Sequence, residues 1–324
     1  MEAPTILVVS ACLMLALAVL GLSRFWVPDR PVSDLISRWA PPPSRFLQVD
    51  GLNAHFRDEG RRDDPEPIVL IHGTSSSLHT WDGWVGELSK TRRVVRVDLP
   101  GFGLTGPNPT GRYDLESYTH FMNTFMATLD IRGAMMAGNS LGGFVAWKTA
   151  LDYPDRVKKL VLVDSAGYAY KSNKMPIAFT LARMPALAPI ITRILPRNVV
   201  AESVREVYGD PHKVTPELID RYYELTLRPG NREAVIQRFR QLPTGEAAAE
   251  VAGRFEKLIK DIACPTLIIW GGKDRLIPEQ CAERFHQDIR GSQLVVFGEL
   301  GHVPHEEDPI DTLRAVKSFL GQQP

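Results

Sequence analysis

The segment of this chain best suited to nucleophilic chemistry has a G-x-S-x-G pattern at residues 138–142. It follows an apolar run at 134–137 and precedes a helix-like run at 144–148. A strand, a tight turn and a helix in this order place a serine hydroxyl above the edge of a sheet, and the flanking glycines leave room for a strained backbone. We therefore interpret Ser140 as a candidate nucleophile that faces the first N–H groups of the following helix, including that of Leu141.

A serine hydroxyl needs a base, and the base needs an acid that orients it. In a chain with this pattern, the serine is followed first by the acid and then by the histidine. Asp274 follows an apolar strand pattern at 266–270, and His302 follows a second one at 293–297. The residue types, their order and their positions at strand ends predict a catalytic triad of Ser140, Asp274 and His302.

Two other aspartates stand at strand ends and remain alternatives for the acid. Asp164 ends the strand pattern 160–163, from which a carboxylate can reach the same histidine, and Asp98 ends the pattern 94–97. We prefer Asp274 because it alone has a Gly-Gly-Lys-Asp-Arg setting. The competing interpretation of these aspartates is structural, since a strand-end carboxylate also caps the turn that follows it.

An early loop offers the remaining part of such a site. His72 and Gly73 follow an apolar strand pattern, and this loop supplies a second backbone donor to an oxyanion hole. We predict that the Thr74 N–H, with Ser75 as the neighbouring alternative, acts together with the Leu141 N–H. The His72 imidazole is predicted to brace the loop by hydrogen bonding.

Composition limits the function classes that remain. The 324 residues include 38 basic and 38 acidic side chains, and this balance argues against a nucleic-acid partner held by bulk charge. The three cysteines, Cys12, Cys264 and Cys281, show neither metal-ligand spacing nor a disulfide framework. The chain has no phosphate loop and no dinucleotide fingerprint. We expect a small-molecule substrate and no cofactor, and the oligomeric state stays open.

The N-terminus reads as a separate unit. Residues 5–22 carry no charge, and as a helix they would span roughly 27 Å, enough for a bilayer core. We predict that residues 1–26 form a retained single-pass membrane anchor and that residues 27–44 form a stiff, Pro-rich tether. The arginines after the span place the catalytic domain on the cytoplasmic side. A cleaved signal peptide, which would leave a secreted or periplasmic protein, is the alternative.

The rest of the chain alternates between strand and helix patterns. A hairpin pattern at 46–56 and six later strand patterns predict a mostly parallel sheet covered on both faces. The alternation stops after Asp164, and we expect a core of residues 45–165 and 254–324 with a helical cap at 166–253. Apolar positions at 175–195 could line an acyl pocket or touch lipid, or simply pack the cap onto the sheet.

Five motifs together resemble the α/β-hydrolase superfamily. They are His72-Gly73, Asp98-Leu99-Pro100-Gly101-Phe102-Gly103, Gly138-Asn139-Ser140-Leu141-Gly142-Gly143, Gly272-Lys273-Asp274 and Gly301-His302. The resemblance implies an α/β fold with a mostly parallel, eight-stranded sheet, helices on both faces and a helical cap inserted after the sixth strand. The Gly-Asn-Ser-Leu-Gly-Gly motif, with the segment 162–167, resembles bacterial lipolytic carboxylesterases and membrane-bound monoacylglycerol lipases. That likeness implies a serine carboxylesterase or lipase acting on esters with apolar acyl chains.

A second branch of the same superfamily also carries Gly-Asn-Ser at this position. Its members hydrolyse carbon–carbon bonds in ring-fission products and usually have an aromatic residue after the catalytic Gly-His, where this chain has Val303. We therefore predict an ester hydrolase. Carbon–carbon bond hydrolysis and a non-catalytic binding protein of the same fold are the alternatives.

Overall fold

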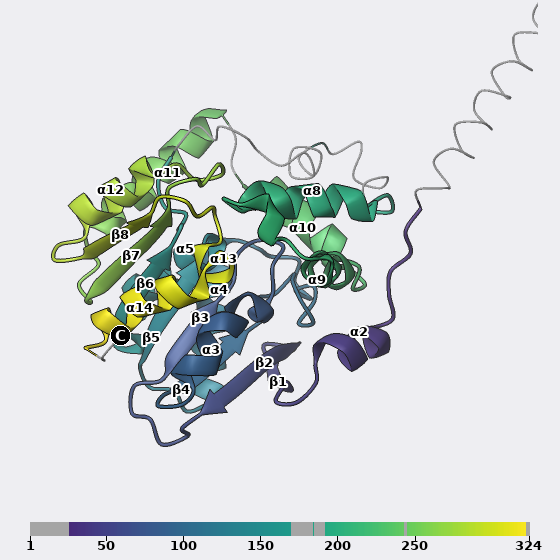
Figure 1. Ribbon diagram of the computed structural model, residues 1–324, viewed down its shortest axis with the longest axis horizontal. Helices are drawn as coiled ribbons and strands as arrows, with labels where there is room; N and C mark the ends of the chain where they lie inside the picture. The colour runs from purple at the N-terminus through teal and green to yellow at the C-terminus, as the bar shows by residue number, and fades with distance from the viewer. Residues whose placement is uncertain (1–25, 170–183, 185–191, 243–244, 322–324) are drawn as a thin grey trace, which may run out of the picture.

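The computed structural model describes residues 26–169, 184, 192–242 and 245–321, which form one sheet with helices on both faces (Figure 1). Within these residues the sheet has eight strands in the order β1-β2-β4-β3-β5-β6-β7-β8. β1 and β2 are antiparallel to their neighbours, and the other pairs are parallel. The strands are β1 (Arg45–Val49), β2 (Leu52–Gly60), β3 (Ile68–Ile71), β4 (Arg93–Val97), β5 (Ala134–Asn139), β6 (Val157–Val163), β7 (Thr266–Gly271) and β8 (Gln293–Phe297).

Helices connect the strands and cover the sheet. The helices of the core are α3 (Asp82–Leu88), α4 (Leu115–Thr128), α5 (Leu141–Asp152), α12 (Gln280–Asp288), α13 (Pro304–Glu307) and α14 (Pro309–Phe319), with 3-10 turns η1 (Leu78–Trp81) and η2 (Pro154–Arg156). Residues of α4, α5 and α12 pack on one face of the sheet, and residues of α3 and α14 pack on the other.

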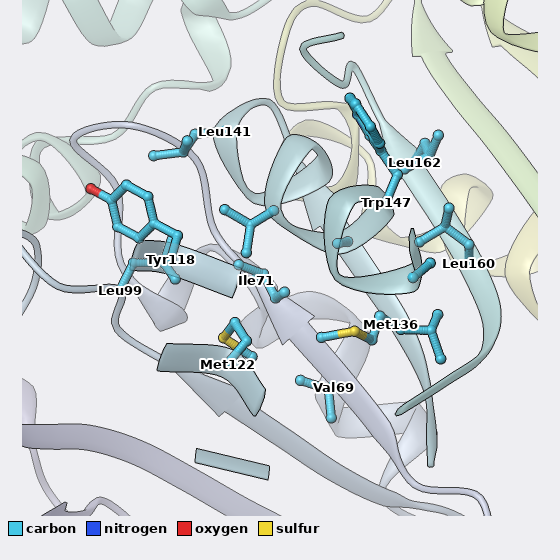
Figure 2. Packing of buried hydrophobic residues seen from close by; sticks show 14 of the residues in the cluster. Val69, Ile71, Leu99, Tyr118, Met122, Met136, Leu141, Trp147, Leu160 and Leu162 are labelled. Atoms are coloured by element: carbon cyan, nitrogen blue, oxygen red, sulfur yellow. The ribbon is translucent and has the colours of Figure 1, made fainter. Parts of the chain in front are cut away.

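The short strand β3 shows why this sheet must be covered on both sides. All four of its side chains are buried: Val69 and Ile71 face the α4–α5 layer, while Ile68 and Leu70 face the α3–α14 layer. Figure 2 shows Val69 and Ile71 in the first of these layers, near Met136 of β5. A continuous apolar strand of this kind is typical of a parallel sheet. The predicted α/β-hydrolase fold class, with its eight-stranded and mostly parallel sheet, is confirmed.

The strand register brings the predicted site residues to one edge of the sheet. Asn139 at the end of β5 pairs with Val163 of β6, and Val163 pairs with Ile269 of β7. Parallel neighbours end on the same side, so the residues that follow β5, β6 and β7 meet there. Ser140 and Asp164 directly follow two of these strands.

Helical elements follow β6 and form the cap. They are α8 (Arg197–Val207), η4 (Pro211–Lys213), α9 (Pro216–Thr226), α10 (Asn231–Gln241) and α11 (Gly245–Ile259). In Figure 1, α8, α9 and α10 gather beyond one edge of the sheet. α11 continues past the predicted cap boundary at residue 253. Most of the segment predicted to line an acyl pocket, 175–195, lies outside the described residues.

The segment 26–40 differs from the predicted stiff tether. Residues 32–39 form helix α2 (Val32–Trp39), and Leu35 is buried with Leu225 of the cap. The Val27 N–H donates to Arg193 O at 2.8 Å and the Arg30 N–H to Leu227 O at 2.8 Å. The segment is therefore docked on the cap, because its backbone and apolar groups find partners there.

The structure contradicts the predicted localisation as a single-pass membrane protein. None of the helices in the described part of the chain is long and apolar enough to cross a membrane. The longest of them, α11, has 15 residues and spans about 22 Å, short of the roughly 30 Å of a bilayer core. The predicted anchor itself, 1–26, lies outside the described residues except for Trp26.

Candidate active site

The candidate nucleophile Ser140 occupies a strained turn between β5 and α5. Its backbone angles are φ 56° and ψ −114°, a left-handed φ that non-glycine residues rarely adopt. The Ser140 N–H donates to Val163 O at 3.0 Å, and Ser140 O accepts from the Ala166 N–H at 3.1 Å. The turn is thus held by the neighbouring strand, and the side chain stays partly exposed.

The glycines around Ser140 are required by close backbone packing. A Cβ on Gly138 would lie 2.1 Å from Gly142 O, and a Cβ on Gly142 would lie 2.2 Å from Ile71 O. Gly143 has the Ser165 hydroxyl oxygen 2.5 Å from the same position. No larger residue fits these places, so the G-x-S-x-G-G pattern follows from the geometry of the turn.

Asp274 and His302 are directly paired. His302 Nδ1 lies 2.7 Å from Asp274 Oδ2, and both side chains are buried. Asp274 Oδ1 accepts the backbone N–H groups of Leu276 at 2.7 Å and Ile277 at 3.1 Å. With Nδ1 donating to Asp274, His302 Nε2 keeps its lone pair for a proton, as a general base requires.

Asn139 connects the histidine loop to the nucleophile turn. Its Nδ2 donates to His302 O at 2.9 Å and to Val163 O at 3.2 Å. Asn139 directly precedes Ser140, so the strand that carries the serine also holds the backbone of the histidine. The sequence analysis included Asn139 in a motif but assigned it no role.

The two predicted oxyanion donors belong to segments that adjoin the nucleophile turn. Leu141 is the first residue of α5, and the first N–H groups of a helix have no partner within it. A Cβ on Gly73 would lie 3.2 Å from Ser140 Cβ, so the loop that carries Thr74 packs directly on the turn. Ser75, with φ 60°, forms the bend that follows.

His72 links this loop to the strand beside it. Its Nδ1 lies 2.7 Å from Gly73 O, and its Nε2 accepts the Leu99 N–H at 2.9 Å. These two bonds require the neutral ring with its proton on Nδ1. Complete burial lowers the pKa of His72, in agreement with a neutral imidazole.

The two alternative acids have different positions. Asp98 lies outside the site: its Oδ2 is 2.7 Å from His55 Nδ1 and its Oδ1 accepts the Leu78 N–H. Asp164 lies within it, since the side-chain oxygen or nitrogen atoms of Asp164, Asp274 and His302 lie within 4.8 Å of one another. Both oxygens of Asp274 already accept hydrogen bonds from protein groups, so we assign no metal site to this cluster.

Sequence reasoning missed a further acid, Glu307. Its buried carboxylate accepts the Gly301 and Gly209 N–H groups at 2.8 Å and the Asp210 N–H at 2.9 Å. Val207 O accepts the His302 N–H at 2.7 Å. The His302 loop is therefore fastened to the end of the cap helix α8, a contact that no local motif signals.

Glu306 joins the cap to the oxyanion loop. It accepts the Tyr208 hydroxyl at 2.7 Å and the Tyr222 hydroxyl at 3.2 Å, and it pairs with Arg221. The Ser76 hydroxyl lies 3.3 Å from the Tyr222 hydroxyl. This network links the cap to the loop that carries Thr74.

A serine at a strand–helix turn, with a paired histidine and aspartate and helix amides beside it, is typical of a serine hydrolase. The chain belongs to the α/β-hydrolase fold family, whose model matches residues 66–309. It is a hydrolase of this fold.

Three similar proteins show the range of chemistry among its relatives. The 2-hydroxy-6-oxo-2,4-heptadienoate hydrolase of Pseudomonas putida F1 is 30% identical over 284 residues, which cover 86% of this chain and 96% of that protein. A meta-cleavage product hydrolase from Pseudomonas fluorescens IP01 has a TM-score of 0.73 at 27% identity, covering 86% of this chain and 97% of that one. A thermophilic esterase from Thermogutta terrifontis has a TM-score of 0.69 at 25% identity, covering 86% and 98%.

Proposed function

We propose that this hydrolase cleaves a carbon–carbon bond next to a ketone in a ring-fission product, with Ser140, His302 and Asp274 as its triad. The relative named for a 6-oxo-dienoate substrate, 30% identical over 86% of the chain, is the observation that carries the bond type. The His302–Asp274 pair behind the Ser140 turn supports the chemistry. This reverses the order of the two activities predicted from sequence, where ester hydrolysis came first.

In the proposed first step, Ser140 Oγ attacks the ketone carbon while His302 Nε2 takes its proton. The N–H groups of Thr74 and Leu141 bind the oxyanion, and each such donor contributes about 3 kcal/mol to the barrier reduction. Asp274 keeps the Nδ1 proton in place and stabilises the charged ring.

The carbon–carbon bond between the attacked ketone carbon and its neighbour in the conjugated chain then breaks. The leaving carbon receives the proton from His302, after its electron pair has delocalised into the conjugated chain of the substrate. Water, deprotonated by His302, releases the acyl group from Ser140 as a carboxylic acid. No external reductant or oxidant is needed, because the overall reaction adds one water molecule across a carbon–carbon bond.

Ester hydrolysis is the second candidate, and two local observations favour it. Val303 occupies the position where ring-fission hydrolases usually have an aromatic residue, and it is buried against the cap residues Tyr208 and Ile219. Dienoate substrates carry a carboxylate, and the half-buried Arg221 is already paired with Glu306. An ester with an apolar acyl chain needs no such cation.

Turnover of two substrate classes by the full chain tests the proposal. A vinylogous diketone ring-fission product and p-nitrophenyl esters of graded chain length would be compared by kcat/KM. We expect the diketone to be preferred and Ser140→Ala to lower both activities by about 10⁴-fold or more. Preference for the esters would select the second candidate.

Two further results would reject the triad itself. One is full turnover by Ser140→Ala. The other is failure of a fluorophosphonate probe to label Ser140 in the folded wild-type chain, which would favour a non-catalytic binding protein of this fold.

A further inference from the structure

The buried acid Asp164 has no role in the mechanism described above. It directly follows β6, between the strands that carry Ser140 and lead to Asp274. Its φ of 44° is left-handed, a strained conformation for a non-glycine residue. The Asp164 N–H donates to Ile269 O at 3.0 Å, so the neighbouring strand β7 holds this conformation in place.

The two oxygens of Asp164 have different surroundings. Oδ1 accepts the Gly271 N–H at 3.0 Å, whereas Oδ2 is buried and has no hydrogen-bond partner among the described residues. An ionised carboxylate with one unpaired oxygen in a buried site carries a large desolvation cost. A neutral carboxylic acid avoids most of this cost and has a proton to donate.

The acidic groups around Asp164 also favour its neutral form. Burial, first, and then the charge of Asp274 raise the pKa of Asp164 well above its usual range, and Glu307 on α13 adds to the shift. The His302 ring also belongs to the cluster, but it is paired to Asp274 and not to Asp164. Two neighbouring carboxylates of this kind divide the charge unequally, with one ionised and the other neutral.

We propose that Asp164 is a reserve acid for the triad: it stays neutral while Asp274 is ionised, and it takes over the negative charge when Asp274 is neutralised. This inference rests on the proposed roles of Ser140 and His302. In the wild-type protein Asp164 carries no charge, and Asp274 remains the acid of the triad. Its carboxyl group lies within the same 4.8 Å cluster as the His302 nitrogen, near enough to stabilise the protonated ring.

The variant Asp274→Asn tests whether Asp164 becomes charged when Asp274 carries no charge. It keeps the shape of the side chain and removes the charge that suppresses ionisation of Asp164. Where a triad has no second acid, the corresponding change lowers kcat by about 10⁴-fold. We expect a loss of only about 100-fold here, and a further loss of at least about tenfold in Asp164→Asn/Asp274→Asn, measured on the better of the two substrate classes.

The pH profile supplies a readout that a purely structural role would not change. In Asp274→Asn, the rate should rise with pH more steeply than in the double variant, because Asp164 also loses its proton there. Asp164→Asn alone keeps a neutral side chain of the same shape. It is therefore expected to retain at least about a third of the wild-type rate.

Three outcomes overturn the inference. Equal rates for Asp274→Asn and the double variant would show that Asp164 carries no charge there. A loss in Asp164→Asn as large as in Asp274→Asn would make Asp164 the principal acid instead. A pH profile of Asp274→Asn that persists unchanged in the double variant would assign the titration to another group.

Folding and the proposed function are controlled separately. Thermal unfolding and fluorophosphonate labelling show whether each variant is folded with a reactive serine, and rates are expressed per labelled protein. Full turnover by Ser140→Ala would reject the proposed function itself. With Ser140 confirmed, the comparison of single and double variants tests Asp164 alone.

Discussion

Two regions meet at Ser140 and are built from different interactions. On the sheet side, backbone packs against backbone, with Gly138, Gly142 and Gly143 allowing no side chain. On the cap side, carboxylates and hydroxyl groups form the contact, with Glu306 and Glu307 accepting donors from both the cap and the His302 loop. The first region is held by shape and the second by charge and hydrogen bonds.

This difference determines how each region responds to change. Close backbone packing cannot relax around an added methyl group, because strands and helices would have to move together. A hydrogen-bonded contact loses one bond at a time, and its strength depends on protonation. The sheet side therefore keeps the geometry of the nucleophile constant, and the cap side is where substitutions and pH can loosen the site.

The largest effect on stability is expected for Gly142→Ala. The added Cβ would lie 2.2 Å from Ile71 O and 2.6 Å from His72 O, so α5 and β3 must separate. We expect a loss of about 3 kcal/mol or more in the free energy of unfolding, measured by urea denaturation. Gly86→Ala in the exposed part of α3 is the control, since nothing lies within 4 Å of its new Cβ. Equal stability of the two variants would contradict the rigid packing of the sheet side.

A smaller effect is expected on the cap side for Glu307→Gln. The amide keeps one acceptor oxygen but loses the charge that accepts three backbone N–H groups. We expect a loss of about 1.5–3 kcal/mol in the free energy of unfolding. The rate should also fall, since the His302 loop is less firmly held.

Glu299→Gln provides the matched control for Glu307→Gln. Its carboxylate is 86% exposed and contacts only the half-exposed Lys273 among the described residues, and such surface pairs contribute little to stability. If both variants unfold alike and turn over substrate alike, Glu307 does not hold the histidine loop.

The smallest effect concerns pH and His79, which lies under both α2 and the cap. Its Nε2 is 2.7 Å from Trp39 O, and its own carbonyl lies 3.5 Å from Arg221. The pKa of His79 is lowered to about 3, chiefly by burial; the charge of Asp98 opposes the shift, those of Arg221 and Arg57 add to it, and that of Asp82 opposes it. In the folded state His79 therefore stays neutral at pH values where the same histidine in the unfolded chain binds a proton.

Because the unfolded state binds more protons below its pKa of about 6.5, stability is lost as the pH falls. Between pH 7.5 and 5.5, His79 should account for about 1.4 kcal/mol of that loss. His79→Gln, compared with wild type by urea denaturation at both pH values, should show a shallower decrease. An unchanged decrease would remove His79 from the pH-sensitive part of the cap contact.

Much of the core and of the candidate site could be predicted from the sequence because the signals are local. Strand patterns such as 68–71 and 266–270 are short apolar runs that end in glycine or polar residues. The turn at Ser140 is indicated by six consecutive residues, 138–143. The order of serine, acid and histidine needs no knowledge of distance along the chain.

Other features could not be predicted because they depend on segments that meet only in the folded chain. Glu307 is an ordinary helix glutamate until Gly209 and Gly301 come near it. The segment 26–40 looks like a spacer because its partners, Arg193 and Leu227, lie far along the chain. The raised pKa of Asp164 likewise depends on burial by the fold and on a carboxylate more than a hundred residues away.

By itself, then, the sequence determined the strand–turn–helix pattern around Ser140, the alternation of strands and helices along the chain and the choice of Asp274 and His302 as candidates. The glycine and serine spacing of the turn and the apolar periodicity of the strands are both visible in consecutive residue types. Only the tertiary structure decided which acids are buried beside one another, how the cap holds the His302 loop and where residues 26–40 dock. Those outcomes depend on burial and on hydrogen bonds between distant segments, which residue types alone do not specify.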